Sequence, residues 1–171
     1  SDGKKDAGDR LARELGLRLF ALRGTTSMPA AGIDATLDRA AAIAATQPGK
    51  PVVIADIWDN PGGGNAGDGT LVLRRMIERG FASVAVSTIW DPMAVTFCHA
   101  AGEGAGIPLR FGGKCGPAAG EPIDATVTVV KAVAEAWQGF GRSEVPLGPA
   151  AVVRLAGTEI DVILNTNRAQ T

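Results

Sequence analysis

Polar and glycine residues crowd one short stretch of the chain, DNPGGGNAGDG at positions 59–69, directly after the apolar run PVVIADIW. A glycine-rich loop presents backbone N–H donors without side chains in the way, which suits a carboxylate or a developing oxyanion. Carboxylates and an amide beside those donors add groups that could orient a substrate. The candidate substrate-binding residues of this stretch are Asp59, Asn60, Gly62, Gly63, Gly64, Gly67 and Asp68.

The same stretch satisfies the dinucleotide-binding pattern GxGxxG literally, through Gly62, Gly64 and Gly67. Against that interpretation, Asp68 stands at the expected helix start, where its carboxylate would compete with a pyrophosphate for the same donors. A Walker A loop is excluded, because no Lys-Ser or Lys-Thr follows the last glycine. An NAD-type nucleotide-binding module stays open as an alternative function.

A second alternative gives the loop no chemistry. Its glycines would only permit turns with positive φ, and Asp68 would cap the following helix. The domain would then be purely structural or serve oligomerisation.

A lysine in the turn-rich segment GGKCGPAAGEP is a further candidate. Lys114, flanked by glycines nearby, could swing toward an anionic substrate group, although a solvated surface lysine is the simpler interpretation. Two cysteines, Cys98 and Cys115, and a single histidine, His99, are too few and too poorly spaced for a disulfide scaffold or a structural zinc site. We therefore expect no self-contained metal site and no cofactor in this chain.

The elements that must position these residues are predicted from hydrophobic periodicity. Leucines at helical spacing indicate an amphipathic helix over about 6–23, and a second helix covers 34–47. From there the pattern alternates, with strands expected at 52–58, 81–90 and 107–113 and helices at 69–80 and 92–105, capped by Gly80 and Asp91 respectively. Strands at 125–133, 150–156 and 160–166 follow, and GTE at 157–159 is typical of a hairpin turn.

This alternation predicts an α/β fold with a mixed, largely parallel sheet flanked by helices and extended by antiparallel strands near the C-terminus. The run 52–58 is apolar and β-branched apart from Asp56, as expected of a strand buried on both faces of a parallel sheet. Asp59 and Asn60 would then lie at the carboxyl end of that strand, the edge along which open α/β sheets bind ligands.

Composition sets the broad class. The chain has 171 residues, of which 46% are hydrophobic and 20% charged, which fits one globular domain. A formal net charge of -1 gives no reason to expect nucleic acid or an anionic membrane as a partner. Since no apolar run approaches the ~20 residues of a membrane span and the N-terminus is polar, we expect a soluble protein, with the cytoplasm as the default location.

Several segments together carry a resemblance, in the order VVIADIWDNPGGGNAGDGT, IWDP, AGEGA, GGKCGP, VPLGPAAVVR and IDVILNTNRAQ. Over about residues 50–170 the sequence resembles the carboxy-terminal domain of the microcystinase C (MlrC) family of zinc metallopeptidases. The stretch from Asp59 to Asp68 is the most specific part, because it is much longer than a generic GxGxxG match.

The resemblance implies a parent protein that is a zinc-dependent hydrolase of peptides or small amides. It also implies that the zinc ligands lie mainly in a preceding N-terminal domain of the same chain, so that residues 1–171 would be an internal fragment with a helical lead-in at 1–49 and an MlrC-like region at 50–171. The fragment alone is expected to be inactive, and a homo-oligomer is possible. Cys115 departs from the family, in which that position often holds histidine.

Overall fold

A computed structural model describes residues 2–26 and 29–169, which belong to two compact units, 1–32 and 33–171. In the first unit, helix α1 (Lys5–Ala21) confirms the helix predicted over about 6–23. None of its residues is buried, and its apolar side chains, among them Leu11, Leu15 and Leu19, are exposed. The predicted apolar stripe therefore exists without a buried contact within its own unit.

The second unit begins with α2 (Ile33–Thr46), close to the predicted 34–47. It packs against α3 (Leu71–Glu78), burying Leu37 on one side, while Leu73 of α3 enters the core of the unit. Gly80 follows α3 with a φ of +66°, and the N–H of Phe81 reaches back to the carbonyl of Met76, so the predicted glycine stop is confirmed.

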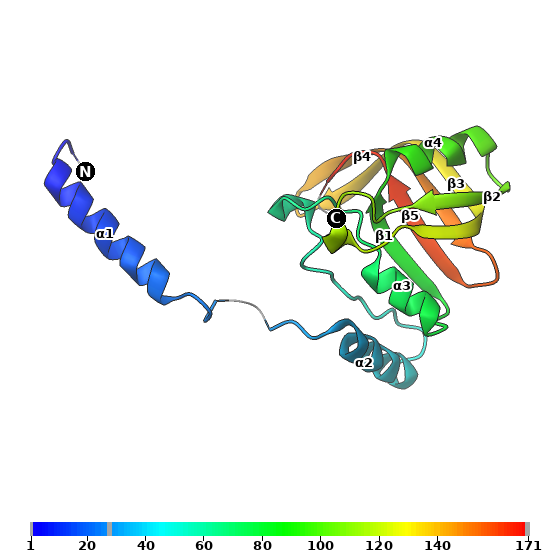
Figure 1. Ribbon diagram of the computed structural model, residues 1–171, viewed down its shortest axis with the longest axis horizontal. Helices are drawn as coiled ribbons and strands as arrows, with labels where there is room; N and C mark the ends of the chain where they lie inside the picture. Colours follow the sequence, from blue (N-terminus) through cyan, green and yellow to red (C-terminus); the bar gives the residue numbers. More distant parts are fainter. Residues whose placement is uncertain (1, 27–28, 170–171) are drawn as a thin grey trace. The chain divides into compact units, whose positions relative to one another are not determined.

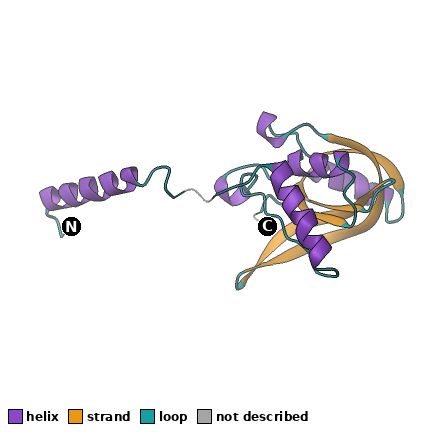
Figure 2. Cartoon of the chain, turned by 90° about the horizontal axis from the view of Figure 1, so that it is seen from below, coloured by secondary structure: helices purple, strands orange, loops and turns teal. Residues whose placement is uncertain are grey.

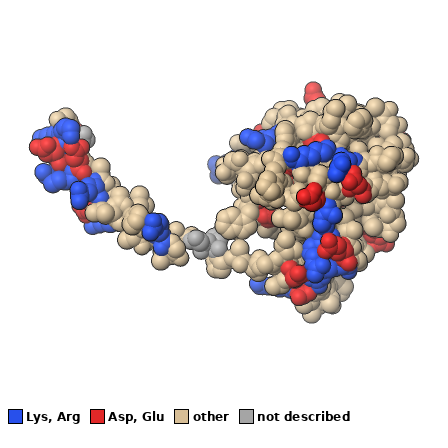
Figure 3. Space-filling view, in the orientation of Figure 1, with Lys and Arg blue, Asp and Glu red and all other residues tan. Residues whose placement is uncertain are grey.

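Charged side chains join α2 and α3. Arg79 donates to Asp34 at 3.2 Å and to Asp38 at 2.5 Å, and the Arg75 guanidinium donates to Asp34 at 2.7 Å. The hydrogen bond from Arg75 holds the pKa of Asp34 below its usual value. Figure 3 shows basic and acidic side chains interspersed over this surface, which agrees with the near-zero net charge.

One curved sheet forms the body of the unit, and Figure 2 shows its strands as a continuous layer. The strand order is β1-β5-β4-β3-β2. Only β1 and β5 run parallel, and the other three neighbouring pairs are antiparallel. The strands are β1 (Val84–Trp90), β2 (Gly106–Phe111), β3 (Ile123–Phe140), β4 (Ser143–Leu155) and β5 (Ile160–Asn165).

The prediction of a largely parallel sheet is therefore wrong, although the α/β class is confirmed. The predicted alternation over 52–110 implied that β1 and β2 run parallel in one sheet, yet they run in opposite directions and lie at opposite edges. The partner of β1 is β5, whereas β2 pairs antiparallel with β3. Hairpins between β3, β4 and β5, including the predicted turn at 157–159, close over short loops and fill the middle of the sheet.

The apolar run 52–58 is a second correction, because it forms no strand. Val53 is 87% exposed and Trp58 is 71% exposed, so the run is not buried on both faces. The hydrophobic residues of this segment favour a β-strand, but the sequence pattern does not specify a neighbouring strand with which it could pair. Asp59 and Asn60 consequently follow an extended segment rather than a strand.

Helix α4 (Pro92–Ala101) covers one face of the sheet and contacts β2, β3, β4 and β5 (Figure 1). Its start is as predicted, since the Asp91 carboxylate accepts the N–H of Ala94 at 3.0 Å. None of the helices in the described part of the chain is long and apolar enough to cross a membrane. The core between α4, α3 and the sheet contains Leu73, Ile89, Val95, Cys98, Phe111, Val127, Val153, Val162 and Leu164.

Candidate functional site

The glycine-rich loop is held from within by a carboxylate. Asp59 accepts the N–H of Gly67 at 3.0 Å through Oδ1 and the N–H of Gly69 at 2.5 Å through Oδ2. A Cβ placed on Gly69 would lie 2.6 Å from Asp59 Oδ2, so the approach depends on glycine at that position. Asp59 therefore acts first on the loop itself, by closing it across ten residues.

Asn60 shapes the tip of the loop. Its side-chain oxygen accepts the N–H of Gly62 at 2.8 Å, and its carbonyl accepts the N–H groups of Gly63 and Asn65 across the short helical turn η1 (Pro61–Gly63). Residues 62–65 are exposed, whereas Gly67 and Asp68 are buried. The tip is thus an exposed, internally hydrogen-bonded strip of nearly bare backbone.

Asp68 joins this loop to the predicted lysine segment. Its Oδ2 accepts the N–H of Lys114 at 2.6 Å and that of Cys115 at 2.9 Å, while its carbonyl accepts the N–H of Gly113 at 2.7 Å. The N-cap of α3 is Thr70, without a side-chain cap, so Asp68 does not cap the helix as the structural alternative assumed. Its carboxylate instead cross-links two loops that lie 46 residues apart in the sequence.

A buried acid completes the connection. Lys114 Nζ donates to Asp91 Oδ2 at 2.7 Å and to the carbonyl of Arg110 at 3.1 Å, and the N–H of Gly112 reaches the same Asp91 oxygen at 3.0 Å. Asp91 is only 4% exposed. Lys114 therefore forms an ion pair with Asp91. The sequence predicted neither this pair nor its partner, since it offered only a substrate-binding lysine or a solvated surface lysine.

These loops meet where the parallel pair of strands ends. Trp90 and Asn165 are register partners at the carboxyl ends of β1 and β5. The N–H of Trp90 donates to the carbonyl of Gly67 at 2.7 Å, and the N–H of Asp91 donates to the carbonyl of Asn165 at 3.0 Å. The carboxyl edge of parallel strands is the place at which α/β sheets bind ligands, and here both loops are fastened to it.

Three buried side-chain oxygens at this edge have no hydrogen-bond partner in the described part of the chain. They are Oδ1 of Asp68 and Oδ1 of Asn165, both in residues that are 1% exposed, and Oγ1 of Thr166, which follows Asn165. Buried polar atoms in native proteins are usually hydrogen-bonded, so each of these acceptors can receive a donor from water or a ligand. The carboxyl edge of β1 and β5 therefore combines two hydrogen-bonded loops with buried oxygens that can still accept a hydrogen bond.

The remaining candidates fall at different places. Cys115 is exposed beside Asp68, and partial desolvation of its sulfur together with that carboxylate raises its thiol pKa, while the charge of Arg168 lowers it. Arg168 is thus within electrostatic reach of this loop. Cys98 is buried, and burial followed by the charge of Asp91 raises its pKa to about 11. His99 Nε2 lies 3.1 Å from the carbonyl oxygen of Ala150, on the packing side of α4.

These residues do not fit a self-contained zinc centre. Among residues 2–26 and 29–169, no three His, Cys, Asp or Glu side chains are grouped so that they could hold a metal ion. Zinc in proteins is bound by three or four such ligands. No step through a metal is therefore assigned to the residues of this chain.

The structure brings the predicted residues together through hydrogen bonds of Gly67 to Asp59, of Gly62 and Gly63 to Asn60, and of the Lys114 backbone to Asp68. Sequence reasoning missed two members of the site. The sequence predicts Asp91 only as a helix cap and assigns no role to Asn165. Asp91 and Asn165 each stand at the end of a predicted strand. That position would have indicated a shared site only if the two strands had been known to be neighbours in the sheet.

Comparison with solved structures supports the architecture. The chain is similar to a chain in a crystal structure described as "Putative metallopeptidase" from Mesorhizobium sp. BNC1, with a TM-score of 0.73 and 24% identity over 90% of this chain and 30% of that one. At this identity the likeness concerns the fold alone. The protein is thus an α/β domain whose candidate site lies at the carboxyl edge of its one parallel strand pair.

Comparison of sequences identifies the family. The family model described as "MlrC C-terminus" matches residues 54–171, and the chain is 37% identical over 120 residues to Microcystinase C from Sphingomonas sp. That match covers 70% of this chain and 23% of the relative. The chain belongs to the MlrC C-terminus family, as the sequence resemblance indicated, and it spans about a quarter of the length of the curated relative it matches.

Proposed function

We propose that this domain is one wall of the active site in an MlrC-like zinc metallopeptidase or amide hydrolase. Its relatives carry the names Microcystinase C and putative metallopeptidase, and the chain spans 23% and 30% of their lengths. The zinc ligands would lie in a preceding N-terminal domain of the same chain. The substrate would be a peptide or a related small amide.

One observation carries this proposal. The exposed glycine strip 62–65 and the 112–116 loop are cross-linked by Asp68 and fastened to the carboxyl edge of β1 and β5. An exposed strip with almost no side chains lets a substrate backbone approach closely, and the hydrogen bonds that hold it would limit reorganisation during the reaction. In that role Asp59 and Asn60 position the strip, and Asp68 positions Lys114, whose ammonium pairs with Asp91.

The loop geometry narrows how the strip can act. The N–H groups of Gly62, Gly63 and Gly64 already donate to Asn60 and Pro61 within the loop. A substrate oxygen would have to displace one of these bonds or meet other donors. The same bonds count against a dinucleotide pyrophosphate, which needs those N–H groups free, and no strand precedes the loop as that fingerprint requires.

The test is metal content and hydrolysis measured on two proteins, the 171-residue chain and the longer natural protein that contains it. After dialysis against trace zinc, we expect near-stoichiometric zinc and hydrolysis of a linear peptide in the longer protein, and neither in the 171-residue chain. Zinc bound tightly by the 171-residue chain would contradict the division of the site. A longer protein with no zinc and no amide hydrolysis would refute the function itself.

A further inference from the structure

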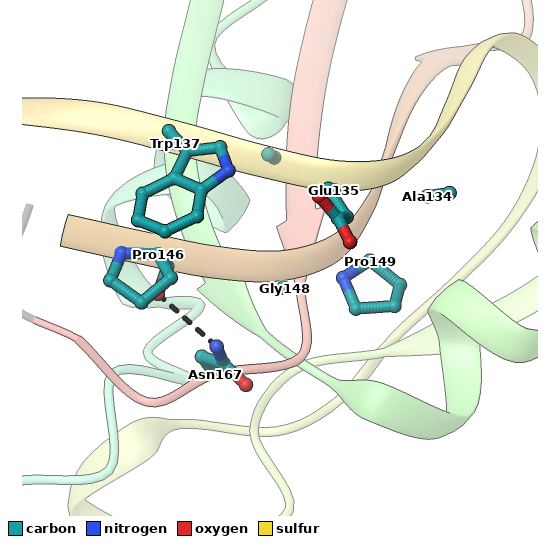
Figure 4. A pocket seen from close by; sticks show the side chains of 8 residues that line it. Ala134, Glu135, Trp137, Pro146, Gly148, Pro149 and Asn167 are labelled. Atoms are coloured by element: carbon teal, nitrogen blue, oxygen red, sulfur yellow. Dashed lines mark hydrogen bonds between the residues drawn. The ribbon is translucent and has the colours of Figure 1, made fainter. Parts of the chain in front are cut away.

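A hollow of about 440 Å³ opens where the long hairpin of β3 and β4 loses its regular pairing. The register shifts twice, between Val133 and Ala136 and again between Ala136 and Trp137, so Trp137 faces Pro146 on the opposite strand. The volume of the hollow lies within the range of small-ligand pockets. The residues that shape the hollow are Glu135, Trp137, Pro146, Gly148, Pro149 and Asn167 (Figure 4).

The sequence builds this irregularity in a defined way. Pro146 and Pro149 have no N–H to donate to the ladder, which favours bulges at their positions. Gly148 has a φ of +69°, and a Cβ there would lie 2.4 Å from Thr166 Oγ1. The N–H of Asn167 donates to the carbonyl of Leu147 at 3.0 Å, and its side-chain amide donates to that of Pro146 at 3.2 Å. The floor of the hollow is therefore fixed before any ligand arrives.

The walls combine an apolar platform with one uncompensated charge. Trp137 is 57% exposed, and Figure 4 shows its indole beside the Pro146 ring, with the Glu135 side chain toward Pro149. Among the described residues, neither the Glu135 carboxylate nor the Trp137 indole N–H has a hydrogen-bond or ion-pair partner. The hollow thus offers a stacking surface, a free donor and a free anion together.

We propose that this hollow is a subsite for an extended peptide that lays a proline or other apolar ring against Trp137 and Pro146 and brings a cationic side chain to Glu135. Aromatic-lined grooves recognise extended, proline-containing segments, because such segments lose little entropy when they bind. The unpaired carboxylate selects for a cation over an anion at that end. The peptide is the substrate of the proposed hydrolase, so this assignment rests on the proposed function.

The position of the hollow agrees with such a subsite. Its lining residue Asn167 follows Asn165 closely in sequence, and the side-chain amide of Asn165 donates to the carbonyl of Asn167 at 2.8 Å. Trp90, at the end of β1, donates its indole N–H to the carbonyl of Thr166 at 2.8 Å. One turn after β5 therefore connects the hollow to the carboxyl edge, so a bound peptide could reach both. Binding away from the reacting amide is a usual source of orientation energy in hydrolases.

The experiment uses the 171-residue chain and NMR spectroscopy, which gives one indole N–H signal for each of Trp58, Trp90 and Trp137. The probes are acetyl-Pro-Pro-Ala-Lys-amide, the matched peptide with glutamate in place of lysine, and acetyl-Gly-Gly-Ala-Lys-amide. We expect the first probe to shift the Trp137 indole and the Gly148 amide saturably, and to leave the exposed Trp58 indole unchanged. The other two probes should bind at least about fivefold more weakly.

Two variants locate the contact. Trp137→Ala should weaken binding of the lysine peptide, followed at the Gly148 amide, about tenfold or more, whereas Trp58→Ala should leave it unchanged. Glu135→Gln, on an exposed side chain, should weaken binding of the lysine peptide and abolish its preference over the glutamate peptide.

Absence of saturable shifts up to about 10 mM peptide overturns the subsite. A Trp137 shift that depends on protein concentration without peptide also overturns it, by making a second copy the occupant. Peptide binding that persists while the longer protein hydrolyses no amide refutes the proposed function and not the peptide contact.

Discussion

The Asp59 carboxylate is predicted to hold the glycine-rich loop in place, and a double-mutant cycle with Gly69 tests that role. Replacing Asp59 by alanine leaves the N–H groups of Gly67 and Gly69 without their acceptor in a partly buried loop. Hydrogen bonds to a charged group contribute about 1.5–3 kcal/mol each, and partial exposure places this pair at the low end, so Asp59→Ala should cost about 3 kcal/mol. For a chain of this size that corresponds to a fall in Tm of about 6–12 °C.

Asp56 provides a matched control three residues earlier. It also accepts two backbone N–H groups, from Trp58 at 3.0 Å and from Asp59 at 3.3 Å, but both bonds are exposed to solvent. Water can replace an exposed acceptor, so Asp56→Ala should cost less than about 0.5 kcal/mol. Both variants are measured by urea denaturation followed by circular dichroism.

The cycle then asks whether the two positions are coupled. In the wild-type chain a Cβ at Gly69 would lie 2.6 Å from Asp59 Oδ2, so Gly69→Ala should cost about 1–3 kcal/mol through crowding. Once Asp59 is alanine that oxygen is gone, and Gly69→Ala should cost at least about 1 kcal/mol less. If the losses in free energy of unfolding are additive, or if Asp59→Ala is as stable as Asp56→Ala, Asp59 is not the residue that holds the loop in place.

Two further outcomes follow from the same site. Lys114→Met should cost about 2 kcal/mol, because it leaves the buried Asp91 carboxylate without its cation, whereas Lys131→Met removes an exposed ion pair and should cost less than about 1 kcal/mol; equal losses in thermal denaturation would contradict this. The thiolate is the reactive form of cysteine, and the pKa of both thiols is raised, so an aromatic disulfide reagent at pH 8 should label Cys115 more slowly than a free small thiol and leave Cys98 unlabelled until the chain unfolds. The Cys115 rate should keep rising above the pH at which an ordinary thiol levels off, and labelling of Cys98 in the folded chain would show that its burial is incomplete.

Local features of the fold could be predicted from the sequence because their causes are local. Asp91 followed by Pro92 marks the start of α4, Gly80 ends α3, and the turn at 157–159 joins β4 to β5. Each depends on a hydrogen bond or a backbone conformation within a few residues. The strand order depends instead on which strand each edge meets, and that competition is decided by contacts between residues far apart in the chain.

The error at 52–58 shows the limit most clearly. Its apolar, β-branched residues satisfy every local requirement of a buried strand, yet Val53 is 87% exposed. The length of the relatives gives this exposure a context, because the chain spans less than a third of them. A segment that suits a strand but lies open directly before the glycine-rich loop is consistent with a site completed by further protein, as the proposed function requires.

Only the local part of the candidate site could be predicted from the sequence, because its other contacts join residues far apart in the chain. Glycine and aspartate at fixed spacing indicated an ordered loop, and that loop exists, but the partners of its carboxylates were not predictable from spacing. The Asp59 carboxylate accepts N–H groups of its own loop and Asp68 Oδ2 accepts N–H groups of a segment 46 residues away, so both acids hold loops in position, and their contact with a substrate stays a prediction. No glycine motif specifies the groups that have no partner among the described residues, which include Asp68 Oδ1, Asn165 Oδ1, Thr166 Oγ1, the Trp137 indole N–H and the Glu135 carboxylate. We therefore expect a substrate to meet the exposed loop backbone and the unpartnered acceptors that Asp59 and Asp68 help to hold in position.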